Sequence, residues 1–226
     1  MELKINVIDA FTDTTFKGNS AAVIIIEDWL SDELMQSIAV ENNLSETAFV
    51  KKIEQHSYEI RWFSPITEID FCGHATLAAS FVIFKQHSDV KKIKFFAKAV
   101  GDLWVTALSN GYIEMVFPNK IPEVIHDIPL ALLNGLSIKP LEVLLNDQAY
   151  FVVYETEADV LLVQQNIELI KQLAPFDVVV TARSKEYDFI SRYFWPANGG
   201  YEDPVTGSIH SGLAPLWASK LNKLDL

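Results

Sequence analysis

Three short stretches of the 226-residue chain carry the side chains best suited to chemistry. "SETAFV" places Glu46 at the start of an apolar strand, "FCGHAT" places His74 at the mouth of a small-residue helix, and "EDPVTGS" places Asp203 shortly before a second such helix. Desolvation beside an apolar strand would favour the protonated form of Glu46, which suits an acid or base near neutral pH. His74 could move a proton or hold a carboxylate. The simpler alternatives are a solvated glutamate, a structural histidine and a turn or N-cap aspartate.

The elements around these residues contain a repeat. "RWFSP" at Arg61–Pro65 resembles "RYFWP" at Arg192–Pro196, and each is followed by an acidic loop, a glycine and a helix of small residues. In this comparison Asp203 corresponds to Asp70. Chance similarity of two turns is one explanation. A duplicated α/β unit is the other, and it would present two helix N-termini to a shared cleft that binds an anion such as a carboxylate.

Hydrophobic periodicity and turn residues predict the remaining elements. A polar segment with three prolines, residues 118–129, suggests a boundary between domains at 1–117 and 118–226. Helices are expected from Ser31 onward and at about 76–86, 130–136, 157–173 and 208–220, and strands at 4–10, 21–27, 58–63, 92–97, 103–108, 112–117, 142–145, 150–153, 177–181 and 189–194.

Composition excludes several classes of function. The net charge of −12 argues against nucleic acids and anionic membranes as partners, because both bind best to a positively charged protein surface. The single cysteine, Cys72, excludes an internal disulfide and fits a reducing cytoplasm. The N-terminus lacks a signal-peptide pattern, and the longest apolar run, residues 21–26, is too short to span a bilayer. No phosphate-binding glycine loop of the dinucleotide or P-loop type is present, and no histidine–carboxylate spacing resembles a metal site, so we expect no metal.

Four motifs in order resemble the phenazine-biosynthesis PhzF-like family, which has a diaminopimelate-epimerase-type fold. They are "NVIDAFTDTTFKGNSAAVI", "NNLSETAFV", "RWFSPITEIDFCGHATLAAS" and "GGYEDPVTGSIHSGLAPLW", and they span residues 5–217. The resemblance implies an α+β fold of two pseudo-symmetric domains, each a curved, mostly antiparallel sheet around a central helix. It also implies an active site between the domains, cofactor-free acid–base isomerisation of a small carboxylated substrate, and a homodimer.

Residue by residue, the resemblance implies a catalytic role for Glu46, supported by His74 and Asp203. It implies that Gly73, Gly207 and Ser208 form a backbone and hydroxyl cradle at the helix mouths. Asn19 of "GNSAAV" falls in the family's first loop and is expected to contact the ligand. The family name implies isomerisation of a dihydro-hydroxyanthranilate.

Two departures keep other functions open. Racemases of this fold use two cysteines, and Cys72 stands where one would be, but the second position is Thr206. A racemase or epimerase acting through Cys72 therefore remains an alternative. The chain also ends at "LNKLDL", where family members usually continue into further strands. We therefore expect exposed apolar surface around Leu213, Leu216 and Trp217, and a catalytically degenerate binding module is a third possibility.

Overall fold

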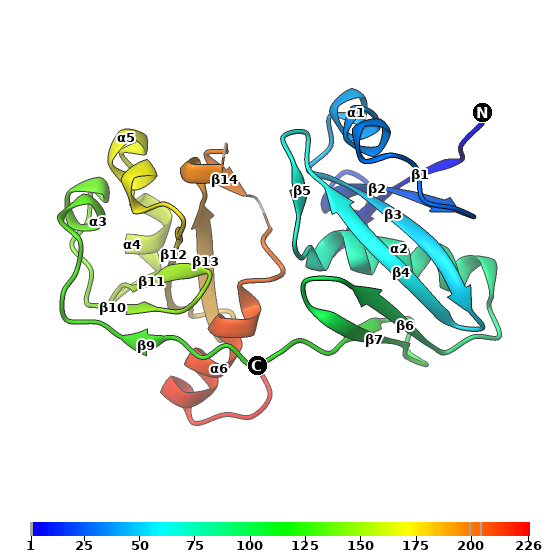
Figure 1. Cartoon of the computed structure of the whole chain (residues 1–226). Coiled ribbons are helices and arrows are strands. Elements are labelled where there is room, and N and C mark those ends of the chain that lie inside the picture. Colours follow the sequence, from blue (N-terminus) through cyan, green and yellow to red (C-terminus); the bar gives the residue numbers. More distant parts are fainter. Residues whose placement is uncertain (1, 199, 204) are drawn as a thin grey trace. The chain divides into compact units, whose positions relative to one another are not determined.

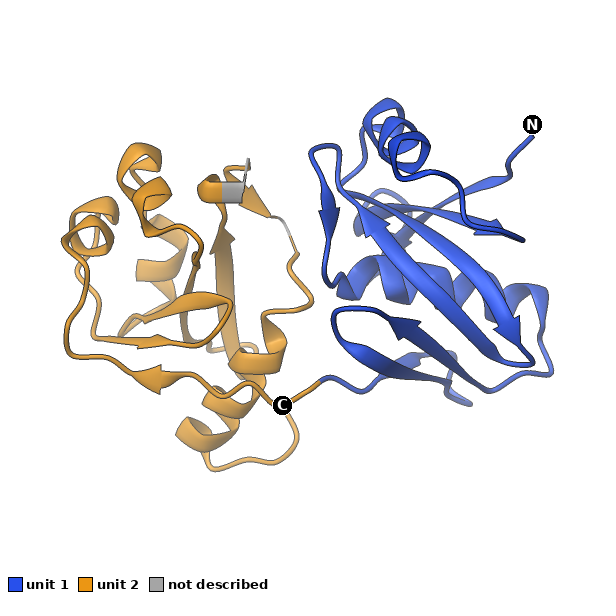
Figure 2. Cartoon of the chain, in the orientation of Figure 1, with its two compact units in different colours: residues 1–117 blue, residues 118–226 orange. Residues whose placement is uncertain are grey.

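The computed structural model describes residues 2–198, 200–203 and 205–226. The chain divides into two compact units, Met1–Phe117 and Pro118–Leu226, coloured blue and orange in Figure 2. The change from one unit to the other falls at the start of the proline-bearing segment.

The first unit is built on an eight-stranded, mostly antiparallel sheet (Figure 1). Its main path runs β1-β2-β3-β4-β6-β7-β8, with β5 paired to β4. The pairs β2–β3 and β4–β6 are parallel. The strands are β1 (Ile5–Ala10), β2 (Asn19–Ile26), β3 (Glu46–Glu54), β4 (Ser57–Phe63), β5 (Glu68–Ile69), β6 (Lys92–Ala97), β7 (Gly101–Ala107) and β8 (Ile113–Met115).

Helix α2 (Gly73–Gln86) is the core element of this unit. Its small residues Ala75, Ala78 and Ala79 are at most 1% exposed, and they let the helix lie close against the strands. The same hydrophobic cluster takes Trp62 from β4 and Phe95 from β6. The sheet therefore packs around α2, which begins three residues before the expected start because the Gly-His pair is itself helical.

A second helix, α1 (Asp32–Asn42), covers the other face of the first sheet through Met35 and Ala39. Ser31 is its N-cap and accepts a hydrogen bond from the Leu34 backbone N–H, as its position before two acids predicts. The sequence pattern therefore located this helix start correctly.

The second unit has a six-stranded sheet in the order β14-β13-β12-β11-β10-β9. Among the described strands of this sheet, only the β11–β12 pair is parallel. Its strands are β9 (Glu123–Val124), β10 (Glu142–Leu145), β11 (Ala149–Val153), β12 (Asp177–Arg183), β13 (Phe189–Phe194) and β14 (Glu202–Asp203). Its helices are α3 (Leu130–Gly135), α4 (Glu157–Leu162), α5 (Ile167–Ile170) and α6 (His210–Leu221), with 3₁₀ turns η1 (Lys171–Leu173) and η2 (Pro196–Asn198).

Both faces of this second sheet are covered. One face packs against residues of α3, α4 and α5, and the other packs against α6 (Figure 1). The expected exposure of the α6 side chains is wrong: Leu213, Leu216 and Trp217 are at most 5% exposed. They are buried because they pack on Phe151 and Tyr193 of the sheet. The structure thus confirms the α+β class, with two mostly antiparallel sheets that each pack on a helix.

The single helix expected at 157–173 is also wrong. Helix α4 ends at Leu162, its C-cap residue Val163 has an extended ψ of 135°, and Gln165 then forms a β-bridge with Leu136. Asn166 starts α5 by accepting a hydrogen bond from the Leu169 N–H. The apolar periodicity of the sequence continues through this break. It therefore did not reveal that α4 is capped at Val163 and that α5 starts after Asn166.

The repeat seen in the sequence is present in three dimensions. In the first unit, Arg61 of β4 forms a bidentate ion pair with Glu68 of β5. Its Nε lies 2.6 Å from Oε1 and its Nη2 lies 2.7 Å from Oε2. In the second unit, Arg192 of β13 pairs in the same way with Glu202 of β14, at 2.7 and 2.8 Å. The strand registers, Phe63 opposite Glu68 and Phe194 opposite Glu202, match as well.

This register corrects one detail of the sequence comparison. Since Glu202 matches Glu68, the next residue, Asp203, matches Ile69 and not Asp70. The extra residues of the second copy lie before the acids, between Pro196 and Glu202, and the spacing from Glu68 to Gly73 equals that from Glu202 to Gly207. Pairing the acids by their order in each loop therefore misplaced Asp203.

Candidate active site in the first unit

Glu46 and His74 form a close pair at the mouth of α2. Glu46 is the first residue of β3 and His74 the second residue of α2, and Glu46 Oε2 lies 3.0 Å from His74 Nε2. Their side chains are 14% and 6% exposed. The approach does not have the angles of a hydrogen bond, and neither atom has another hydrogen-bond partner among the described residues. Two buried polar atoms are therefore left able to bond to a ligand.

Cys72 is the third member of this cluster. Its Sγ lies 3.4 Å from Nδ1 of His74, so the imidazole stands between a thiol on one nitrogen and a carboxylate on the other. One possible ligand atom from each of these three residues lies within 4.8 Å of the other two, which is close enough for all three to bind one metal ion. A metal bound to one ring nitrogen would leave either the thiol or the carboxylate on the far side of the ring. The arrangement suits proton movement through the imidazole better than chelation.

The N-terminus of α2 carries no side-chain cap. Its N-cap residue is Cys72, and Gly73 and His74 supply the first helical N–H groups. The hydroxyl of Thr76 donates instead to the Cys72 carbonyl, at 2.6 Å. Uncapped N–H groups at a helix start are hydrogen-bond donors with a partial positive charge, so this end of α2 favours an anion beside the Glu46–His74 pair.

Asn19 lies beside the start of the strand that carries Glu46. It is the first residue of β2 and is 3% exposed, and its Oδ1 accepts a hydrogen bond of 3.1 Å from the Ser45 hydroxyl. Ser45 precedes Glu46, so this bond ties the start of β3 to the start of β2. Contact of Asn19 with a ligand stays a prediction.

The other predicted site residues belong to the second unit. Asp203 ends β14 and accepts hydrogen bonds from the Thr206 hydroxyl and from the Val205 N–H. Gly207 starts the turn into α6, and its carbonyl accepts from the His210 N–H at 3.2 Å. Thr206, which occupies the position of a second racemase cysteine, is thus engaged with Asp203.

Ser208 lies in the same turn, and its partner was not foreseen. Its Oγ accepts a hydrogen bond of 2.9 Å from Gln148 Nε2, and Gln148 also contacts the Tyr193 hydroxyl, which in turn bonds to Asp177. The repeat offered a signal for Asp177, since "PFDVVV" and "LSETAFV" both place an acid at the first position of a strand. Nothing in the local sequence around Gln148 pointed to it.

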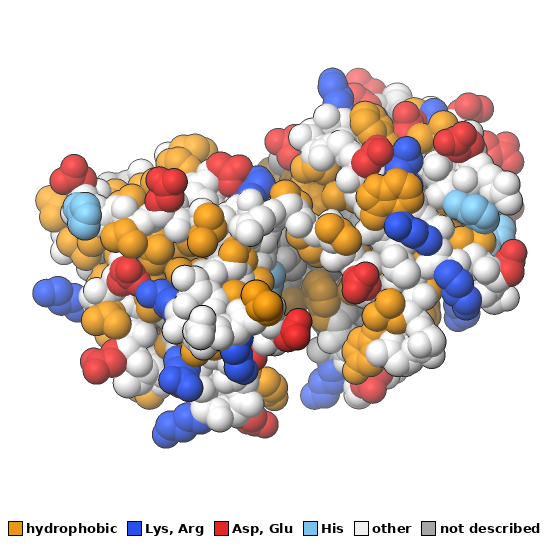
Figure 3. All heavy atoms as spheres, turned by 90° about the horizontal axis from the view of Figure 1, so that it is seen from below, with side chains coloured by type: hydrophobic (Ala, Val, Ile, Leu, Met, Phe, Trp, Pro, Cys, Tyr) orange, Lys and Arg blue, Asp and Glu red, His pale blue; other side chains and the backbone are white. Residues whose placement is uncertain are grey.

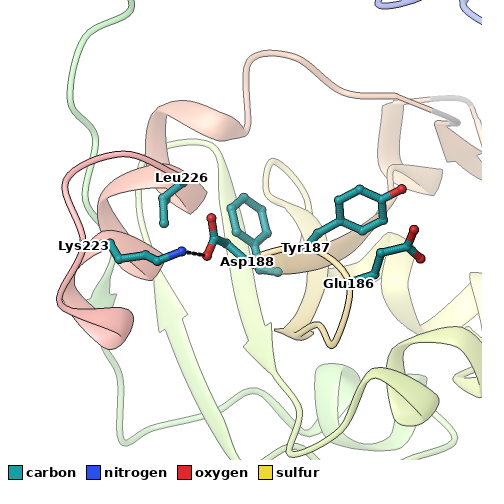
Figure 4. A pocket seen from close by; sticks show the side chains of 6 residues that line it. Glu186, Tyr187, Asp188, Lys223 and Leu226 are labelled. Atoms are coloured by element: carbon teal, nitrogen blue, oxygen red, sulfur yellow. Dashed lines mark hydrogen bonds and ion pairs between the residues drawn. The ribbon is translucent and has the colours of Figure 1, made fainter.

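Two surface hollows lie apart from these residues. The larger, about 780 Å³ in the first unit, is lined by Trp29, Arg61, Glu68 and Phe96 among others. The second is an open hollow in the second unit where Lys223 pairs with Asp188 below Leu226 (Figure 4). Neither contains the Glu46–His74 pair or Ser208. On the face shown in Figure 3, basic side chains are scattered among acidic and apolar ones.

None of the described helices has both the length and the apolar character needed to cross a membrane.

Comparison with known proteins identifies the family to which the chain belongs. Residues 8–225 match the family model described as phenazine biosynthesis-like protein. An uncharacterized isomerase of Pseudomonas aeruginosa is 45% identical over 100% of this chain and 86% of its own length.

Solved structures agree with this match. A PhzF-family phenazine biosynthesis protein of Enterococcus faecalis superposes with a TM-score of 0.89 at 41% identity, covering 99% of this chain and 85% of that one. A hydroxyproline epimerase of Agrobacterium vitis, at 10% identity, shares the fold with a TM-score of 0.61, over 96% of this chain and 77% of its own. The chain belongs to the phenazine biosynthesis-like (PhzF) family, whose fold it shares with amino-acid epimerases.

Proposed function

We propose that this protein is a cofactor-independent isomerase in which Glu46 moves a proton on a small carboxylated substrate, with His74 as its partner. Family membership and an epimerase among the proteins that share the fold support an isomerase or epimerase in general. The observation that carries the specific proposal is the buried Glu46–His74 pair, 3.0 Å apart at an uncapped helix start.

The geometry supports the following sequence of steps. Glu46 removes a proton from a carbon that is activated by an adjacent unsaturated or carboxylated group, and the negative charge spreads into that group. The N–H groups of Gly73 and His74 at the start of α2 stabilise the developing charge because they are donors fixed in place before the reaction. Glu46 then returns the proton to a different carbon. His74 assists because its Nε2 lies 3.0 Å from the carboxylate, close enough to accept or return the transferred proton once the ring turns toward it.

The second unit contributes binding groups in this proposal. Gly207 and Ser208 supply a backbone N–H and a hydroxyl for the substrate carboxylate, and Asp203 orients the loop that carries them through its bond with Thr206. The proposed substrate class includes a dihydro-hydroxyanthranilate, and the proposed assembly is a homodimer in the cytoplasm.

Proton NMR in D2O tests the proposal with a dihydro-hydroxyanthranilate and a panel of small carboxylated compounds. Wild type should form an isomer or incorporate deuterium, and Glu46→Gln should lower that rate by about 10²–10⁴-fold, the usual contribution of a general acid or base. Glu54→Gln is the matched control, because it makes the same change at the exposed last residue of the same strand. Equal rates in wild type and Glu46→Gln would end the proposal.

One observation favours a second candidate function. The Cys72 thiol touches the His74 ring on the side opposite Glu46, so a thiol and a carboxylate could serve as the two acid–base groups of an epimerase. Cys72→Ala distinguishes the two candidates. Retained exchange supports the Glu46 isomerase, whereas loss of exchange in both Cys72→Ala and Glu46→Gln supports the epimerase.

A further inference from the structure

The two halves of the chain place a carboxylate at the same topological position. In the first unit, the parallel pair β2–β3 begins with Ala21 opposite Glu46. In the second unit, the parallel pair β11–β12 begins with Ala149 opposite Asp177. Asp177 is therefore the counterpart of Glu46, and Ser208, which follows Gly207, is the counterpart of His74.

The two carboxylates are connected differently to their helix mouths. Glu46 reaches His74 directly. Asp177 reaches Ser208 through two intervening side chains. The Tyr193 hydroxyl donates to Asp177 Oδ2 at 2.8 Å, and Gln148 Nε2 donates to the Tyr193 oxygen at 3.2 Å and to Ser208 Oγ at 2.9 Å.

The carboxylate fixes the direction of every bond in this series. A carboxylate only accepts, so the single proton of the Tyr193 hydroxyl must point to Asp177. The Tyr193 oxygen then has only lone pairs to offer Gln148, so the amide nitrogen must face it. The same nitrogen contacts Ser208, whose oxygen is therefore also an acceptor. The Ser208 proton is left to point elsewhere, and no acceptor for it is found among residues 2–198, 200–203 and 205–226.

The members of this network are held firmly. Tyr193 is 6% exposed, and burial together with the neighbouring Asp177 holds the pKa of its phenol well above its ordinary value, so it remains a donor. The Gln148 backbone N–H donates to Asn146 Oδ1 at 2.8 Å, and the Gln148 carbonyl accepts from the Asp177 N–H at 3.2 Å. Gln148 is thus fixed through both its main chain and its side chain.

We propose that Asp177, Tyr193 and Gln148 are positioning residues that hold the Ser208 hydroxyl as an outward donor, which selects substrates bearing a carboxylate over neutral analogues. This inference rests on the proposed function, in which Ser208 binds the substrate carboxylate. It adds three residues and a physical basis for selectivity that the Glu46–His74 pair does not supply.

Gln148→Glu tests the polarity, because a glutamate can only accept and would turn the Ser208 proton inward. The probes are anthranilate and its neutral amide, anthranilamide, with each Kd measured by isothermal titration calorimetry. Gln148→Glu should weaken anthranilate binding by about 10-fold or more, the usual worth of a hydrogen bond to a charged group, and change anthranilamide binding less than twofold. The added negative charge could repel anthranilate by itself, so the same change is also made in a Ser208→Ala background.

The double-mutant cycle decides the question. If Gln148 acts through Ser208, Gln148→Glu should weaken anthranilate binding less than twofold in the Ser208→Ala background. Tyr193→Phe, which adds no charge, should weaken anthranilate in the same direction. An equal effect of Gln148→Glu with and without Ser208 would overturn the inference, as would no effect of Tyr193→Phe.

Exchange measured on the same preparations separates the two proposals. Glu46-dependent deuterium exchange together with an additive cycle would leave the proposed function standing and refute the role of Gln148. A wild-type protein that neither binds anthranilate nor catalyses exchange would overturn both.

Discussion

Gly212 lies in the first turn of α6, close against Phe151 of the sheet. A Cβ added there would lie 2.4 Å from Cζ of Phe151 and 3.0 Å from Nδ2 of Asn146. Carbon atoms normally approach to about 3.5–4.0 Å, so the Phe151 ring would have to retreat by about 1 Å. That ring has no exposed surface and lies in a strand of five buried residues, so it has no free space to enter.

The expected cost of Gly212→Ala follows from two opposing effects. Overpacking of a tight core destabilises the folded state by about 1–3 kcal/mol, whereas replacing glycine by alanine within a helix stabilises it by about 1 kcal/mol. Since a rigid ring must move, we place the overpacking near its upper limit and expect a net loss of about 1–2 kcal/mol in the free energy of unfolding.

Urea unfolding followed by circular dichroism measures this loss. Gly135→Ala is the matched control, because its new Cβ would meet Cδ1 of Ile170, the end of a flexible side chain, at 2.7 Å. It should cost less than half as much as Gly212→Ala. Phe151→Leu should also cost less in the Gly212→Ala background than in wild type, because the smaller side chain relieves the overlap. A Gly212→Ala protein as stable as wild type would refute the packing argument.

Two further predictions concern residues of the second unit. Arg192 Nη1 donates to the carbonyls of Val160 and Val163 in addition to the Glu202 pair, whereas Arg61 Nη1 donates to the exposed carboxylate of Asp32. Arg192→Lys should therefore cost about 1–2 kcal/mol and more than Arg61→Lys by urea unfolding; equal losses would contradict this. Burial raises the pKa of Tyr154 to about 12, so the unfolded chain loses this proton near its ordinary pKa of about 10 while the folded one keeps it. Stability should therefore fall between about pH 10 and 12, and a Tyr154→Phe protein with an unchanged slope would count against this cause.

Much of the fold was predictable because local signals agreed with tertiary packing. The Ser31 cap, the β10 and β13 boundaries and the strand of residues 92–97 all occur as the sequence indicated. The helix expected at 157–173 failed because its interruption depends on a bridge from Gln165 to Leu136, a contact between distant residues. The burial of Leu213 likewise depends on a sheet whose presence on that side of α6 no local pattern reveals.

The candidate site was predictable in part for the same reason. Glu46 and His74 stand in short motifs whose resemblance to the family implied that they act together, and they lie 3.0 Å apart. Cys72 and His74 are two positions apart, but motifs do not fix the side-chain directions that bring them into contact. The series from Asp177 to Ser208 joins residues up to 60 positions apart, and no local pattern reveals such contacts.

The central claim is that Glu46 carries the proton, and deuterium exchange tests it most directly. Wild type, Glu46→Gln and Glu54→Gln are incubated in D2O with a dihydro-hydroxyanthranilate and the panel of carboxylated compounds, and the spectra are followed over time. We predict exchange or isomer formation in wild type and Glu54→Gln, and a loss of about 10²–10⁴-fold in Glu46→Gln with its fold intact. Exchange at the wild-type rate in a folded Glu46→Gln protein would contradict the claim.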